Sequence, residues 1–143
     1  MKKILNLFRG RISRKTFFLS YLLLLALGFL YFGLAPIEED QFEKYTIIWT
    51  YGLIVLLIPF FAIALSLHIR RLHDIGLSGF FVLAQILFII LGTFESWQVM
   101  AYYLDILYWL LLVLKTGEDK DNEYGLMPSS KIKFWEVAFN LEK

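Results

Sequence analysis

Four apolar runs constrain the fold of this chain more than any other feature of its sequence. Phe17–Ala35, Tyr45–Ile69 and Leu77–Phe94 contain no charged residue, and Met100–Leu114 contains one, Asp105. A transmembrane helix needs about 20 mainly apolar residues, because each residue advances the helix by about 1.5 Å through a hydrocarbon core about 30 Å thick. The runs predict an all-α protein, an integral membrane bundle of four transmembrane helices in a single membrane domain. We place these helices at residues 16–35, 46–69, 78–94 and 98–114.

The composition favours a membrane protein and limits the available chemistry. Hydrophobic residues make up 59% of the chain and charged residues 19%, whereas soluble domains have about 45–50% and about 25%. The sequence has no cysteine, which excludes disulfides, thiolate metal sites and thiol catalysis. The apolar core of a cleaved signal peptide has about 7–15 residues, so we interpret the longer run Phe17–Ala35 as a retained helix.

The charges between the runs predict the orientation. Six Lys and Arg residues and no acid lie within Met1–Lys15, and Arg70 and Arg71 follow the second run. The two connections on the other side hold a single cation, in the acidic loop Pro36–Lys44. Cytoplasmic segments carry the excess of Lys and Arg, so we expect both termini and the loop Arg70–Gly79 in the cytoplasm.

The segments at the two ends are expected to lie at the membrane surface. Apolar residues are interleaved with the cations of Met1–Lys15, which is typical of a segment in the headgroup layer. Lys115–Pro128 is polar and rich in turn residues, which predicts a loop. Ile132–Leu141 mixes large apolar side chains with lysines and glutamates and predicts a short interfacial helix.

Single residues mark the expected helix ends. Ser13 and Thr16 are alternative caps for the first transmembrane helix. Gly76 is expected to adopt a left-handed conformation after the second helix, and Ser78 to cap the third. Pro59 removes a backbone hydrogen bond near the middle of the second helix and predicts a kink there.

Three motifs are expected on the cytoplasmic side, before the first helix, after the second and after the fourth. They are Gly10-Arg11-Ile12-Ser13-Arg14, Arg70-Arg71-Leu72-His73-Asp74-Ile75-Gly76-Leu77-Ser78-Gly79, and Gly117 with Asn122, Tyr124, Gly125 and Pro128. Together they resemble the small bacterial inner-membrane proteins grouped as domain-of-unknown-function family 805, over about residues 8–128. The pattern of that family has a second glycine in the third motif where this chain has Lys120. The resemblance implies a multi-span fold in the bacterial inner membrane and no established activity.

The three motifs are expected to converge into one cytoplasmic polar cluster. Its candidate members are Arg11, Arg14, Arg70, Arg71, His73, Asp74, Ser78 and Asn122. Each cation near an anionic leaflet contributes about 1 kcal/mol to membrane binding. The cluster therefore predicts a non-enzymatic protein that binds anionic lipid headgroups, a membrane protein partner or a second copy of the chain. The alternative is that the cations only set the orientation. No cofactor, metal ion or nucleic acid is expected.

His73 and Asp74 suggest another functional hypothesis, a membrane-embedded hydrolase, because a carboxylate can orient an imidazole as a base. Adjacent residues rarely point at one atom, however, and no further metal ligands follow at the usual spacing. The structural interpretation is that Asp74 pairs with Arg11, Arg14 or Arg71, while His73 hydrogen-bonds the turn.

Asp105 is the one charged residue within the four runs. A carboxylate near the centre of a transmembrane helix costs about 2.5–3.5 kcal/mol on insertion scales. Tyr51 of the second helix and Gln85 of the third reach a similar depth, and we expect them to hydrogen-bond this carboxylate. Asp105 is then either a packing residue that faces the bundle interior, or the ion site of a small transporter or ion-conducting oligomer.

Overall fold

The computed structural model describes residues 7–33 and 39–128, whose regular secondary structure is helical apart from one isolated β-bridge between Asn122 and Gly125. The helices are α2 (Arg14–Gly33), α3 (Glu39–Asp74), the 3-10 helix η1 (Gly79–Phe81), α4 (Val82–Leu91) and α5 (Gln98–Leu114). The predicted interfacial helix over Ile132–Leu141 and the first six residues lie outside the described residues. The all-α prediction is confirmed for the described part of the chain.

Within the described residues, two helices are long and apolar enough to cross a bilayer. They contain the segments Arg14–Tyr31, in α2, and Tyr51–Asp74, in α3. The apolar helices over Gly79–Leu91 and Gln98–Leu114 are shorter. By length and composition, α2 and α3 point to a membrane protein.

The prediction of a loop throughout Pro36–Lys44 is wrong, because α3 already begins at Glu39. The helix then continues through Pro59 to its end. At 36 residues, α3 exceeds the length that a bilayer requires.

At its other end, α3 extends past the predicted boundary at Ile69 and ends at Asp74. Arg71 and His73 lie in this last turn, where the negative end of the helix dipole favours cations. Gly76 follows with a φ of 78°, which confirms the predicted left-handed residue. Half of the expected Arg70–Gly79 loop is therefore a helix end with fixed side-chain directions.

The third apolar run forms two short helices rather than one helix over residues 78–94. η1 leads directly into α4, which ends at Leu91. The chain then turns, and the Thr93 hydroxyl donates to the Ile90 carbonyl oxygen at 2.7 Å. The Thr93 backbone N–H donates to the same oxygen at 3.1 Å, so both donors of Thr93 satisfy this carbonyl at the end of α4.

Two of the predicted caps are confirmed. The Ser13 hydroxyl accepts from the Thr16 backbone N–H at 3.3 Å at the start of α2. The Ser78 hydroxyl accepts from the Phe80 backbone N–H at 3.3 Å at the start of η1. In both cases a side-chain oxygen satisfies one of the free N–H groups at a helix start.

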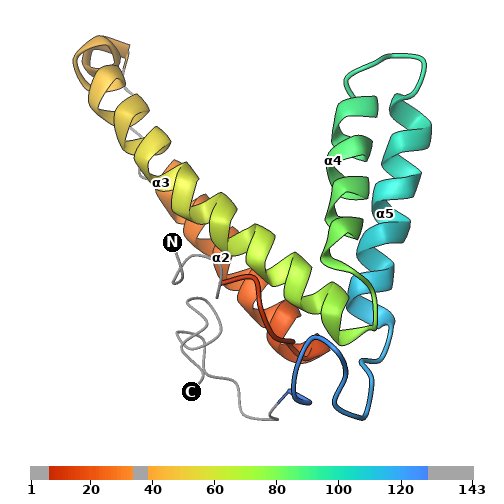
Figure 1. Cartoon of the computed structure of the whole chain (residues 1–143). Helices are drawn as coiled ribbons and strands as arrows, with labels where there is room; N and C mark the ends of the chain where they lie inside the picture. The colour runs from red at the N-terminus through yellow and green to blue at the C-terminus, as the bar shows by residue number, and fades with distance from the viewer. Residues whose placement is uncertain (1–6, 34–38, 129–143) are drawn as a thin grey trace.

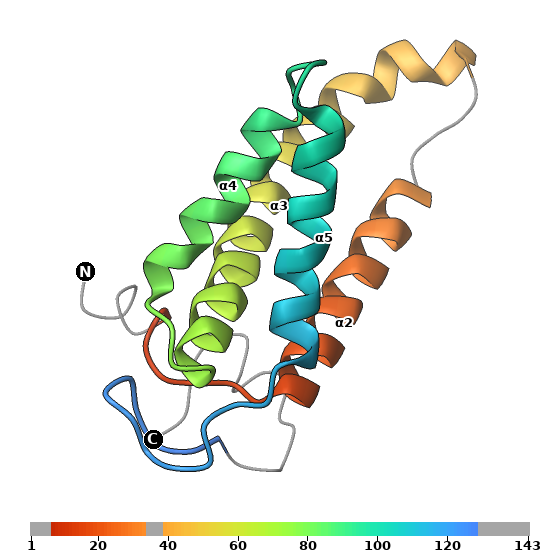
Figure 2. The same cartoon turned by 90° about the vertical axis from the view of Figure 1, so that its right-hand side faces the viewer.

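The helices form two pairs that are joined at one end of the molecule. α2 and α3 run side by side, as do α4 and α5, and the two pairs diverge away from the joined end (Figure 1). The segment before α2, the turn after α3 and the loop after α5 all gather at the joined end, also in the perpendicular view (Figure 2). The fold therefore brings together the three motifs that are far apart in the sequence.

The buried core includes residues from the motif segments as well as from the helices. Its apolar members are Ile12, Phe17, Leu24, Leu67, Leu72, Ile75, Tyr108 and Leu112. By contrast, α4 has no buried residue, and many large apolar side chains on all four α-helices are exposed. Packing is thus concentrated near the joined end, and much of the apolar surface faces outward.

Candidate functional site

A buried ion-pair network lies at the centre of the joined end. Asp74 accepts from Arg11 through Oδ1, with Nη2 at 3.1 Å and Nε at 3.3 Å, and from the Arg71 guanidinium through Oδ2. Arg11, Arg71 and Asp74 are each less than 5% exposed. One carboxylate therefore pairs with two guanidinium groups away from water, where an unpaired charge would be costly.

Local sequence explains why these three side chains meet. Arg71 and Asp74 are three residues apart on α3, so they lie on the same face of the helix. Arg11 comes from the segment before α2, which is held against α3 by a backbone bond from Ile12 N–H to the Arg70 carbonyl oxygen at 3.3 Å. The network thus ties the first motif to the second.

The remaining guanidinium donors point at the end of α5 and the loop after it. Arg71 donates to the carbonyl oxygens of Leu112, at 2.8 Å, and Lys115. Arg14 donates to the Leu114 carbonyl oxygen at 3.1 Å. The last carbonyls of a helix have no partner within the helix and carry its negative dipole end. The arginines of the first two motifs therefore cap α5.

Arg11 also fixes the third motif. Its Nη1 donates to the Lys120 carbonyl oxygen and its Nη2 to that of Glu118, both at 2.6 Å. The family pattern has a glycine at the position of Lys120, yet the backbone approaches the cluster closely here, and the lysine side chain is exposed. Because Arg11 contacts only the carbonyl oxygen, this position tolerates a side chain that points outward.

Asn122 closes the third motif onto α3. Its Nδ2 donates to the His73 carbonyl oxygen at 2.9 Å and to Glu118 Oε2 at 2.7 Å. Glu118 N–H donates in turn to the Asp74 carbonyl oxygen at 2.8 Å. Reciprocal backbone bonds between Asn122 and Gly125, at 3.2 and 3.1 Å, hold the turn. The loop therefore supplies partners to the free carbonyls at the end of α3.

The His73 side chain contacts residues outside the ion-pair network. Its Nδ1 lies 3.2 Å from the Gly10 carbonyl oxygen, to which it can only donate. Its ring stacks on Tyr124, with 4.1 Å between ring centroids and 2° between ring planes. Asp74 meanwhile bonds the two arginines, so His73 and Asp74 have separate partners and form no catalytic pair. Within the described residues, no group of three or more His, Cys, Asp or Glu could hold a metal ion.

The network requires a glycine at position 117, for which the sequence analysis gave no packing role. A Cβ atom on Gly117 would collide with the Asp74 carboxylate. The neighbouring Gly79 is similarly restricted, because a Cβ there would lie 2.8 Å from Ile69 Cγ2 and 3.2 Å from His73 Nε2. The glycines of the motifs therefore allow close packing around Asp74 and His73, which the motif spacing alone did not indicate.

The eight predicted cluster residues thus fall into several groups. The side chains of Arg11, Arg71 and Asp74 bond one another, whereas the His73 ring bonds the Gly10 carbonyl oxygen and Asn122 bonds the His73 carbonyl oxygen. Arg14 reaches the end of α5 but is exposed, Arg70 is fully buried, and Ser78 caps η1. The sequence could not indicate the carbonyl oxygens of α5 and its loop, which are the main acceptors for the arginines.

Asp105 bonds one of its two predicted partners. Gln85 Nε2, on α4, donates to Asp105 Oδ1. The expectation for Tyr51 is wrong: its side chain is 67% exposed and makes no such bond in the part of the chain that is described. Tyr51 lies towards the start of α3, and α3 diverges from α5 away from the joined end (Figure 1).

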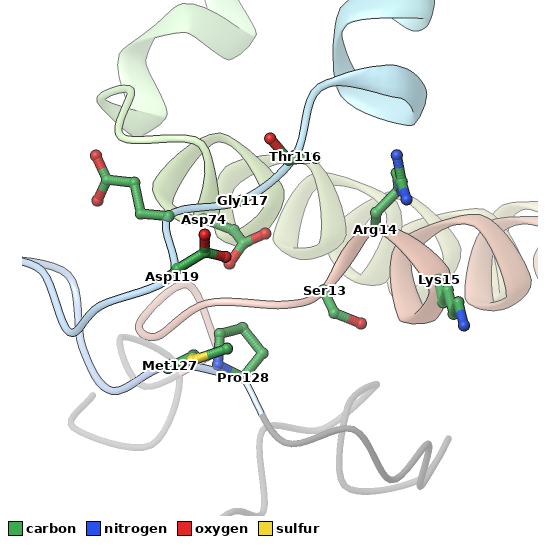
Figure 3. A pocket seen from close by; sticks show the side chains of 10 residues that line it. Ser13, Arg14, Lys15, Asp74, Thr116, Gly117, Asp119, Met127 and Pro128 are labelled. Carbon is green, nitrogen blue, oxygen red and sulfur yellow. The ribbon is translucent and has the colours of Figure 1, made fainter.

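A pocket of about 540 Å³ opens beside the network. Figure 3 shows Arg14 and Lys15, at the start of α2, on one side of it, with Asp74 and Asp119 on the other. It is lined by Ser13, Arg14, Lys15, Asp74, Thr116, Gly117, Glu118, Asp119, Met127 and Pro128. Arg14 and Lys15 are exposed and Asp74 is buried, so the accessible positive charge comes from the start of α2.

Over residues 7–33 and 39–128, the fold and this site define a helical protein with two helices long and apolar enough to cross a bilayer and a buried Arg-Asp-Arg network at one end. The chain belongs to the family described as protein of unknown function (DUF805), whose model matches residues 5–126. This confirms the resemblance drawn from the three motifs. Neither a comparison with curated proteins nor one with solved structures finds a match.

Asp74→Asn should strongly destabilise the protein, because it leaves two buried guanidinium groups without a neutralising charge. Breaking a buried ion pair from one side costs about 3–5 kcal/mol, so we expect the free energy of unfolding in detergent to fall by about 3 kcal/mol or more. Asp119→Asn is the matched control, since Asp119 is exposed in the loop after α5, and it should change stability by less than about 0.5 kcal/mol. Equal effects of the two substitutions would contradict the structural role of Asp74.

Proposed function

We propose that this chain is a four-span protein of the bacterial inner membrane, with the joined end in the cytoplasm, and that it is a non-enzymatic protein that binds the anionic headgroup of a membrane lipid. The headgroup would occupy the pocket beside Arg14 and Lys15. The observation that carries this proposal is that Arg11 and Arg71 are buried and donate to protein oxygens, whereas Arg14 and Lys15 are exposed beside the pocket.

The exposed apolar surface supports four spans rather than two. Large apolar side chains face outward along α4, although soluble proteins rarely expose contiguous apolar patches of more than a few hundred Å². The exposed ones are Leu83, Ile86, Leu87, Ile89 and Ile90. α5 likewise exposes Val99, Tyr102, Tyr103, Leu107 and Leu110. Lipid chains can cover such surfaces, and a short span such as α4 is accommodated by local thinning of the bilayer.

The distribution of cations supports the orientation. Arg11, Arg14, Lys15, Arg70 and Arg71 all belong to the joined end, whereas the turn between α4 and α5 carries Glu95 and no cation. Cytoplasmic segments carry the excess of Lys and Arg. The joined end is therefore the cytoplasmic side in this proposal.

The hydrogen bonds that the arginines already make within the protein indicate which of them are available to bind a ligand. Arg11 and Arg71 are buried, and their Nε, Nη1 and Nη2 atoms all donate to protein oxygens. Arg14 and Lys15 are exposed at the start of α2 and line the pocket. The free N–H groups of a helix start add further positive potential. A lipid phosphate is the anion available at this depth of the membrane surface.

A labelling experiment tests the orientation. Because the chain has no cysteine, single cysteines can be introduced at Ser96, in the turn between α4 and α5, and at Lys120, in the loop after α5; both positions are exposed. A membrane-impermeant maleimide added to intact spheroplasts should label Ser96→Cys, and should label Lys120→Cys only after the membrane is opened. The reverse pattern would overturn the proposed orientation.

A lipid titration tests the binding proposal. Two cations near a phosphate contribute about 2 kcal/mol, or roughly 30-fold in affinity. We therefore expect Arg14→Ala combined with Lys15→Ala to weaken binding of short-chain phosphatidylglycerol by about this factor, measured by native mass spectrometry, and to leave binding of phosphatidylcholine unchanged.

The matched control is Lys115→Ala with Lys120→Ala, which removes two exposed cations of the same end that do not line the pocket. It should retain phosphatidylglycerol binding. An equal loss in this control would mean a diffuse basic surface and would contradict the pocket. Glycerol phosphate, tested alone, distinguishes a soluble phosphate ligand from a lipid.

A further inference from the structure

A second polar site lies between the helix pairs, apart from the Arg-Asp-Arg network. A pocket of about 480 Å³ is lined by side chains from all four α-helices. Tyr21 comes from α2, His68 from α3, Gln85 from α4 and Trp109 from α5. Apart from these, the lining is mostly aliphatic and aromatic, so the few polar atoms determine what the pocket can bind.

The bond between Gln85 and Asp105 fixes the direction of the glutamine amide. A carboxylate only accepts, so the Gln85 NH₂ group faces Asp105. The Gln85 carbonyl oxygen Oε1 then remains as a buried acceptor, and it has no hydrogen-bond partner among the described residues. Asp105 lies nine residues before Leu114, where α5 ends, so it is about 13 Å along the helix axis from that end.

His68 presents a second buried acceptor. Its Nδ1 lies 2.9 Å from the Ala64 carbonyl oxygen and therefore carries the proton. Nε2 of the neutral ring is then an acceptor, and within the described part of the chain it has no partner. The ring is 94% buried and packs against Phe17, Tyr21 and Trp109 with centroid distances of 5.0 to 5.6 Å. These apolar surroundings favour the uncharged ring.

Asp105 places a carboxyl group beside this pocket, because it accepts a hydrogen bond from the lining residue Gln85. It forms no ion pair in the described residues. A buried acceptor without a donor costs about 1–3 kcal/mol. The pocket therefore has two unused acceptors beside a carboxyl group, and no lysine or arginine is among its lining residues.

We propose that the pocket between Tyr21, His68, Gln85 and Trp109 binds a lipophilic protonated amine. The ammonium N–H groups supply the donors that His68 and Gln85 lack, and their positive charge is held close to Asp105. The aromatic faces of Tyr21 and Trp109 attract a cation and also accommodate an apolar body. A metal ion is a poorer fit, because it would require several converging oxygen ligands, whereas the lining is largely apolar.

Three probes of the same shape test the proposal on the unaltered protein. They are 4-phenylbutylammonium, 4-phenylbutyltrimethylammonium, which has the charge without N–H donors, and 4-phenylbutanol, which has a donor without the charge. The intrinsic tryptophan fluorescence of the protein, to which Trp109 in the pocket contributes, is followed in phosphatidylcholine nanodiscs, with empty nanodiscs subtracted. The primary ammonium should bind saturably and at least tenfold more tightly than either analogue. Equal affinities for the three probes would overturn the proposal.

Substitutions then test whether amine binding requires the charge of Asp105. Asp105→Asn keeps an acceptor for Gln85 but removes the charge, and it should weaken 4-phenylbutylammonium at least tenfold. Glu95→Gln, the matched control in the exposed turn between α4 and α5, should leave the affinity unchanged. An unchanged affinity in Asp105→Asn, or an equal loss in Glu95→Gln, would contradict the site. Arg14→Ala with Lys15→Ala should not affect amine binding, so this result is independent of the headgroup proposal.

Discussion

The buried Asp74 carboxylate is the interaction on which the joined end depends. It lies between two guanidinium groups that are themselves buried, and desolvating three charges is affordable only when every donor and acceptor has a partner. Backbone carbonyls supply the guanidinium groups with acceptors in addition to the Asp74 carboxylate. Three carbonyls of the segment after α5 and one of α5 itself accept from Arg11 and Arg71. The ion pairs therefore determine the path of the loop as well as the packing of the side chains.

Because the same few residues bond three separate segments, the helix pairs are tied at one end and diverge at the other (Figure 1). These bonds explain why the motifs contain arginines, an aspartate and glycines. Arginines reach several acceptors at once through their planar, five-donor group, and Gly117 leaves room for the Asp74 carboxylate. His68 and Gln85 line the pocket between the pairs, and Gln85 bonds Asp105.

Sequence reasoning predicted the features that depend on local composition. The apolar runs indicated the helices, Gly76 and Ser78 marked their ends, and the cations indicated which segments share one side. It failed for features that depend on which parts of the chain, distant in the sequence, pack together in the fold. The extension of α3 to Asp74 and the separation of Tyr51 from Asp105 are consequences of helix packing. The buried role of His68 was also missed, since its position in the last turns of an apolar run resembles that of an ordinary charged flank.

A double-mutant cycle between Arg11 and Asp74 tests most directly whether this pair holds the first motif to α3. Arg11→Met, Asp74→Asn and the double variant would be unfolded reversibly in mixed micelles, and their free energies of unfolding compared with the unaltered chain. Contacting residues of one ion-pair network show coupling of about 0.5–3 kcal/mol, and the burial of this pair predicts a value of about 2 kcal/mol or more. Additive losses, within about 0.5 kcal/mol, would show that the two residues act separately and would contradict the account.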